Sequence, residues 1–150
     1  MARVSVNKTR AAMPDIKPDN KKLSRQQARD LDIEIGFLEG VVQRDRNYVE
    51  ALQLLGDDYT RRGRYREGLT VDRRLVRLCP GDPLVHYNLA CSYSCTRQFR
   101  RAARALLKSL ENGYRDFDWL RKDPDLETLR QHSLYQEIES LLEMIEKGEA

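Results

Sequence analysis

Thiols and imidazoles could do chemistry, and one stretch of the sequence contains all of its cysteines, Cys79, Cys91 and Cys95, together with one of its two histidines, His86. Cys91 and Cys95 are four residues apart, which puts both thiols on one side of a helix, and His86 precedes them. A structural zinc site needs four ligands, usually supplied as two close pairs, and no second pair completes this one. We therefore predict no metal and no cofactor, with the thiols acting as small apolar groups.

Catalytic patterns are missing from the sequence as well. Neither of the two histidines, His86 and His132, stands in a pattern that pairs it with a nucleophile, and no glycine-rich phosphate loop occurs. Asp57 and Asp58 are adjacent, so their carboxylates point to different faces of a helix. The prediction is a protein that is not an enzyme.

Composition favours one folded, all-helical domain with a strongly charged surface. Of 150 residues, 40% are hydrophobic and 34% are charged. No run approaches the roughly 18 to 20 apolar residues that cross a bilayer, and the first residues lack the apolar core of a secretory signal. The first fourteen residues carry cations and no acid, as organelle transit peptides do, but the stretch is short. We expect free thiols, no membrane partner and a cytoplasmic location.

Charge alternates in sign along the chain. Residues 1–27 hold seven Lys and Arg against two Asp, a balance of +5, and residues 28–60 have a balance of −5. Residues 61–110 reach +9, mostly from arginine, and residues 111–150 have −6. The charged residues of such blocks either lie on solvent-exposed helix faces or form a patch that binds a charged partner.

Helical periodicity begins near Leu23. Residues 1–22 show no period and contain two prolines, so they are predicted to be a flexible basic arm. Ser24 and Gln27 form a capping box, and Asn47 with Glu50 forms a similar polar helix start. Ala51, Leu54, Leu55 and Tyr59 follow it at helical spacing, which predicts that they stack together. The expected helices cover 24–45, 47–62, 65–79, 84–95 and 98–112, followed by short helices opened by Asp123-Pro124 and by Ser133.

An internal repeat with a period of 34 residues relates the central helices. Shifting the chain by 34 residues places Leu55 on Leu89, Tyr59 on Tyr93 and Tyr65 on Phe99. Small residues also coincide, with Gly56 on Ala90 and Gly68 on Ala102, and these would let the two helices of each repeat approach closely.

With Leu52-x-x-Leu55-Gly56-x-x-Tyr59 and its counterpart ending at Tyr93, the sequence resembles the tetratricopeptide repeat family. Departures are Leu52 and His86 in place of Trp, Asp72 in place of an aromatic, and Tyr114 in place of Pro. The resemblance implies an all-α superhelix, an alpha-alpha solenoid of about two full repeats. Its expected units are an N-terminal capping helix at 23–46, repeats at 47–80 and 81–114, and C-terminal capping helices at 115–150, where Trp119 and Leu120 cover the exposed end.

In that family the first helix of each repeat lines a concave groove. The residues that the resemblance places there are Glu50, Gln53, Asp57, Arg61, Leu84, Tyr87, Asn88, Cys91 and Cys95. Tyr87 is the expected anchor for a partner, because tyrosine is enriched in interface hot spots. The alternative is that it packs against Asp57 or Gln53 of the preceding repeat in a filled groove. Asn88 matches a residue that holds a terminal carboxylate in chaperone-binding members, but Gln53 and Asp57 stand where that clamp needs cations.

Two functional classes follow from the sequence. The first, which we favour, is a non-catalytic adaptor or scaffold that binds a segment of a protein partner in the groove, with self-association between the +9 and −6 blocks as a further expectation. The second is an RNA- or ribonucleoprotein-associated factor that uses a basic patch. That patch consists of Lys8, Arg10, Lys17, Lys21, Lys22, Arg25, Arg97, Arg100, Arg101 and Arg104. No aromatic residues are interleaved with the cations of the arm, which disfavours nucleic acid.

Overall fold

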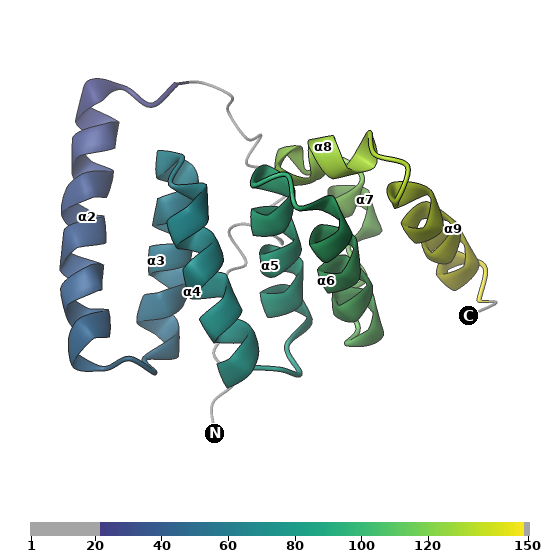
Figure 1. Ribbon diagram of the computed structural model, residues 1–150, viewed down its shortest axis with the longest axis horizontal. Helices are drawn as coiled ribbons and strands as arrows, with labels where there is room; N and C mark the ends of the chain where they lie inside the picture. Colours follow the sequence, from purple (N-terminus) through teal and green to yellow (C-terminus); the bar gives the residue numbers. More distant parts are fainter. Residues whose placement is uncertain (1–21, 149–150) are drawn as a thin grey trace.

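The computed structural model describes residues 22–148, and every regular element in that part is a helix. The longer helices stand side by side in a row, from α2 at one end to α9 at the other (Figure 1). The elements are α2 (Arg25–Arg44), α3 (Val49–Arg62), α4 (Tyr65–Leu78), α5 (Pro83–Cys95), α6 (Phe99–Glu111), α7 (Phe117–Leu120), η1 (Pro124–Leu126), α8 (Glu127–Arg130) and α9 (Tyr135–Glu146). The predicted all-helical solenoid is therefore confirmed. Most of the predicted arm lies outside the described residues.

Local sequence signals set several of the helix ends. The capping box of α2 is present, because the Ser24 hydroxyl accepts from the backbone N–H of Gln27 and the Gln27 side chain accepts from the N–H of Ser24. Asp82 caps α5, whose first residue is proline. Gly63 ends α3 at a φ of 81°, a conformation that glycine adopts without strain.

Three local predictions are wrong. Asn47 does not cap α3, which begins at Val49 after Tyr48 without a side-chain cap. Ser133 does not open α9, since that helix starts at Tyr135 with Leu134 as its N-cap residue and without a side-chain cap. Leu54, which helical spacing placed with the core residues of α3, is 52% exposed. It lies on the edge of the apolar stripe, where the pattern alone does not separate core from surface.

The close approach of α3 and α4 depends on small residues, as predicted. A Cβ added at Gly56 would lie 3.1 Å from Asp72 Oδ1, and one added at Gly68 would lie 3.6 Å from the Gly56 carbonyl oxygen. In the second hairpin Ala90 and Ala102 are fully buried at the equivalent positions. The repeated small residues thus bring the helices of both hairpins together.

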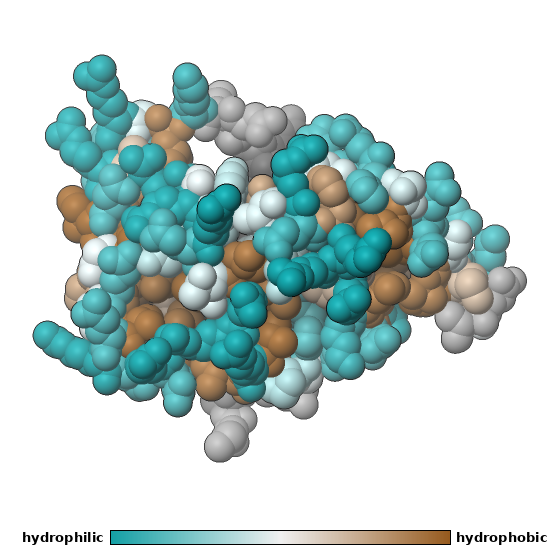
Figure 2. Space-filling view, viewed as in Figure 1, coloured by the Kyte–Doolittle hydropathy of each residue, from teal (hydrophilic) through white to brown (hydrophobic). Residues whose placement is uncertain are grey.

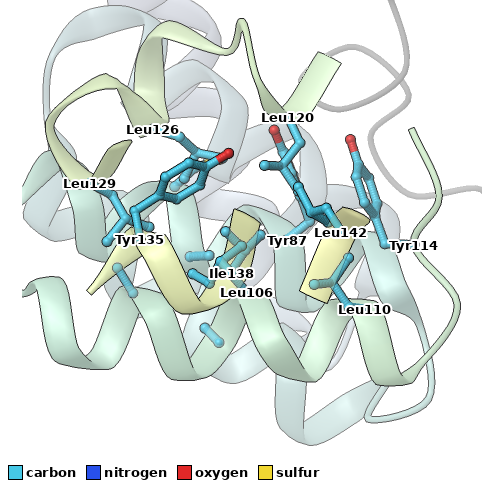
Figure 3. Close-up of a cluster of buried hydrophobic side chains, with 14 of the residues drawn as sticks. Tyr87, Leu106, Leu110, Tyr114, Leu120, Leu126, Leu129, Tyr135, Ile138 and Leu142 are labelled. Carbon is cyan, nitrogen blue, oxygen red and sulfur yellow. The ribbon is translucent and has the colours of Figure 1, made fainter. Parts of the chain in front are cut away.

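Two apolar cores follow one another along the row. One lies between α2, α3 and α4 and includes Ile35, Leu52 and Leu75. The other joins α5 and α6 to the C-terminal segments, where Leu106, Leu120, Leu126, Leu129, Ile138 and Leu142 pack around Tyr87 and Tyr114 (Figure 3). None of the helices between residues 22 and 148 is both long and apolar enough to cross a membrane.

Candidate interaction surface

The face of α5 that was expected to bind a partner is covered by the C-terminal part of the same chain. Tyr87 is fully buried, its ring stacks on Tyr114 with centroids 4.3 Å apart, and its hydroxyl donates to Asp123 Oδ2 at 2.7 Å. Burial raises the pKa of Tyr87 well above its usual range, so the phenol keeps its proton and acts as a donor. Figure 3 shows both tyrosines among the leucines of the C-terminal core.

The thiols of α5 face the same C-terminal segment. Cys91 Sγ donates to Asp123 Oδ2 at 3.7 Å, and Cys95 Sγ lies 3.7 Å from the backbone oxygen of Asp125. One turn away, the hydroxyls of Ser94 and Thr128 are 3.1 Å apart. Polar contacts therefore hold the segment from Asp123 to Thr128 against α5 over about two turns of the helix, from Tyr87 to Cys95.

Cys91, Asp123 and Asp125 place three potential metal-ligand atoms within 4.8 Å of one another. Sequence reasoning missed this group, because Asp123 is 32 residues from Cys91. The Asp123 carboxylate already accepts from the Tyr87 hydroxyl, and its Oδ1 accepts from the backbone N–H of Asp125 at 2.9 Å, which caps η1. These contacts account for the group as the attachment point of the C-terminal segment. His86 also has a structural contact, with its Nε2 2.6 Å from the Pro80 carbonyl oxygen.

The predicted role of Tyr87 as a surface anchor therefore needs correction. Its ring is covered on one side by Tyr114, and Cys91 is fully buried beside it. Asn88 is also buried and Leu84 is half-buried, so the α5 half of the expected groove offers little to a partner. The alternative considered for Tyr87, packing inside a filled groove, describes the geometry, although the partner is Tyr114 rather than a residue of α3.

The corresponding face of α3 is more accessible. Glu50 and Arg61 are exposed at its two ends, and Leu54 is exposed between them. Gln53 and Asp57 are buried beside them, together with Asp58. We call Glu50, Gln53, Leu54, Asp57, Asp58 and Arg61 the α3 surface. Leu54 and Asp58 were not predicted as site residues.

Negative charge is concentrated on the α3 surface. Burial, and then the nearby Glu34 carboxylate, raise the pKa of Asp58 from its ordinary 3.8 to about 6. A guanidinium nitrogen of Arg61 lies 3.9 Å from Asp58 Oδ1. The Arg61 side chain is well exposed, so solvent screens this ion pair and it offsets the charge of Asp58 only weakly. The α3 surface thus combines one exposed leucine with a group of acidic side chains.

The predicted basic patch is divided in the structure. Lys22 and Arg25 lie at the start of α2, whereas Arg97, Arg100, Arg101 and Arg104 lie at and along α6, on the other side of α3, α4 and α5 (Figure 1). Lys8, Arg10, Lys17 and Lys21 lie outside the described residues. Among the described cations, Arg97 rests over the Phe99 ring at 5.4 Å and Arg101 donates to Gln98. The described cations do not form one continuous surface.

Comparison with known proteins agrees with the hairpin geometry. A family model described as tetratricopeptide repeat matches residues 27–90, a stretch that begins inside α2 and ends inside α5. Residues 27–90 of the chain therefore contain tetratricopeptide repeat sequence. The matched stretch of this repeat protein includes most of α2, which was predicted to be an N-terminal cap.

The repeat protein is also similar to a protein of Arabidopsis thaliana whose name describes it as chloroplastic, with 36% identity over 91 residues. The match covers 59% of the chain and 26% of the relative, so the chain spans about a quarter of that protein's length. The relative's name places it in the chloroplast, and the cytoplasmic location expected for the present chain stays a prediction.

Proposed function

We propose that this repeat protein is a non-catalytic interaction module that binds a segment of a protein partner on the α3 surface. The observation that carries the proposal is the exposure of Leu54, 52% accessible in the middle of a helix whose neighbouring positions are acidic. In such a site, apolar contact with Leu54 would supply affinity and the acidic side chains beside it would supply orientation.

The chemistry of the surface indicates the kind of segment that would bind. An apolar side chain of the partner would cover Leu54, and a Lys or Arg beside it would approach Glu50 and the Asp57–Asp58 pair. The pKa of Asp58 is raised first by burial and then by the nearby Glu34 carboxylate. A basic residue of the partner would lie close to both of these acidic groups.

A binding role also agrees with the structural contacts that the potentially reactive side chains make. Cys91, Asp123 and Tyr87 are engaged in attaching the C-terminal segment, and His86 contacts a backbone carbonyl. These are the groups from which a catalytic site would have been assembled.

Selection of peptides from a random display library tests the proposal. We expect the full chain to enrich peptides that contain an apolar residue next to Lys or Arg, with dissociation constants in the micromolar range, about 1 to 100 µM, by fluorescence polarisation. Leu54→Glu should weaken binding at least about tenfold, which corresponds to about 1.4 kcal/mol.

Met144→Glu is the matched control, because Met144 is 43% exposed on α9, away from the α3 surface. It should change peptide affinity less than about twofold, a value within the usual effect of a surface substitution. Failure to enrich any peptide, or equal affinities of the Leu54→Glu variant and the unmodified chain, would exclude the α3 surface as the binding site.

A further inference from the structure

The outer face of α2 carries the two most exposed large apolar side chains of the described residues. Ile33 is 71% exposed and Phe37 is 69% exposed, and they lie one turn apart, so they form one ridge. The buried side of the same helix holds Leu31, Ile35 and Leu38. Because α2 is the end helix of the row, its outer face has no neighbouring helix in the described part of the chain (Figure 1). Brown apolar atoms are visible at this end in Figure 2.

Two glycines lie on the same face, next to the ridge. Gly36 and Gly40 are also one turn apart, and a Cβ added at either would meet no atom within 4 Å. With 100° of rotation per residue, positions 33, 36, 37 and 40 fall within about 100° of one another around the helix. The face therefore has large side chains at one pair of positions and open space at the other.

We propose that this face binds a second copy of the chain, with the two α2 helices antiparallel around a two-fold axis between positions 36 and 37. In this register Ile33 of each copy lies over Gly40 of the other, because both positions are near the centre of the stripe, and the two Phe37 rings meet on one flank close to the axis. Ile33 thus meets a position without a side chain, which allows the helices to approach closely. The surface is complementary to itself, as a two-fold interface requires.

Charge supports the same register. Asp30 and Arg44 lie on the same flank of the apolar stripe and are both exposed. The two-fold axis is perpendicular to both helices, so the same flank of each helix lies on the same side of the interface. The register places position 30 of one copy opposite position 43 of the other. Asp30 of one copy therefore lies beside Arg44 of the other, and the symmetry repeats this pair at the far end. Asp30 Oδ1 accepts from Gln26 of its own helix at 2.8 Å, and the exposed carboxylate has further acceptor capacity for the guanidinium.

A second copy is the occupant that accounts for both features of the face. A different partner would explain the exposed Ile33 and Phe37 but would not require open positions at matching distances on the same helix. The contact involves one helix from each copy, well below the roughly 800 Å² per partner of a standard interface, so we expect a weak dimer with a dissociation constant of about 10 to 100 µM.

Sedimentation equilibrium of the full chain, from about 5 to 500 µM, measures this association. We expect a monomer–dimer equilibrium without larger species. Phe37→Glu should raise the dissociation constant at least about tenfold. Gly40→Gln should do the same by filling the space that receives Ile33, and it also favours the helix, so loss of the dimer cannot be attributed to unfolding. Met144→Glu, a change at a comparably exposed apolar residue on α9, should leave the equilibrium unchanged.

Charge reversal tests the register itself. Asp30→Arg and Arg44→Asp should each weaken the dimer severalfold, and the double variant should recover most of the loss, because the exchange restores both ion pairs. A monomer at every concentration, an open polymer, or a dimer that survives both Phe37→Glu and Gly40→Gln would overturn the proposal. A dimer that requires Phe37 but gains nothing from the double charge reversal would overturn the register.

Discussion

The hairpins α3–α4 and α5–α6 have the same turn and different surroundings. In the first, the backbone N–H of Gly63 donates to the Thr60 carbonyl at 3.0 Å, and in the second the N–H of Arg97 donates to the Ser94 carbonyl at the same distance. The residues that follow also match, since Arg64 N donates to the Tyr59 carbonyl and Gln98 N to the Tyr93 carbonyl. The 34-residue period thus extends to individual hydrogen bonds.

The first helices of the two hairpins, α3 and α5, differ in how the polar groups at equivalent positions are hydrogen-bonded. In α5 the hydroxyl of Tyr87 donates to Asp123 and that of Ser92 to Asp72. At the equivalent positions of α3, Gln53 Nε2 and Asp58 Oδ2 are buried without a hydrogen bond to any described residue. Burying a polar atom without a hydrogen bond destabilises a fold, so these two positions of α3 contribute less to stability than their counterparts in α5. Two repeats with the same internal geometry therefore present different surfaces, because the C-terminal segment packs against α5 and not against α3.

The largest expected effect comes from breaking the contact that closes the α5 face. Tyr87→Ala should lower the free energy of unfolding by about 3 to 5 kcal/mol, because it leaves a cavity beside Tyr114 and removes the hydroxyl that Asp123 accepts. Gln53→Ala, the same position one repeat earlier, should cost less than about 1 kcal/mol, since its amide nitrogen has no hydrogen bond within residues 22–148 to lose. Urea denaturation followed by circular dichroism measures both. Equal losses would show that the two faces are energetically alike.

A smaller effect should depend on pH and belong to α3 alone. The folded-state pKa of Asp58 is about 6, above its ordinary 3.8, so the fold favours the protonated carboxyl. The stability that this group contributes is complete below about pH 4 and is lost as the pH rises through about 6. Asp58→Asn should therefore stabilise the chain at pH 8 by about 1 to 2 kcal/mol, with little effect at pH 4.

Ser94→Ala on α5 serves as the control, because the Ser94 hydroxyl contacts the neutral hydroxyl of Thr128 and neither group titrates in this range. Its effect on unfolding should be a loss that hardly changes over the same pH range. Urea denaturation at pH 4, 6 and 8 separates the two cases, and a stabilisation by Asp58→Asn that is the same at all three values would contradict the assignment.

The smallest expected effects come from exchanging the turn residues of the two hairpins. Gly63 has a φ of 81°, and its counterpart Arg97 has a φ of 59°, the one non-glycine residue with positive φ among the described residues. Gly63→Ala should cost about 1 kcal/mol, because a side chain is disfavoured in this conformation. Arg97→Gly should stabilise by about 0.5 kcal/mol, after loss of the contact with Phe99. Opposite signs in thermal unfolding are expected, and equal signs would refute the equivalence of the turns.

Sequence patterns predicted the helical elements well and the exposed surfaces poorly. The ends set by Ser24, Gly63, Asp82 and Gly113 were predictable, because a cap or a left-handed glycine acts within a few residues of the chain. The cap assigned to Asn47 was wrong, since a polar residue near a helix start is common and its bond depends on the exact geometry of the turn.

The candidate site was predicted only in its location along α3 and α5. Tyr87 was expected on a surface, because nothing near it in the sequence announces that Asp123 and Tyr114 will meet it. Leu54 was expected in the core, because it follows Ala51, which is buried, by three residues. Both errors have the same origin: periodicity states which side chains share a face, and not what lies against that face.

By itself the sequence determined the helices, their 34-residue period and the pairing of small residues that brings the helices of each hairpin together. These features depend on contacts between residues close in the chain, or on a repeat that is visible in the letters. Only the tertiary structure decided that the segment from Asp123 to Thr128 covers α5, that the faces of α3 and α2 are left exposed, and that Asp58 lies near Glu34. Those outcomes depend on contacts between distant segments, whose free energies no local pattern contains.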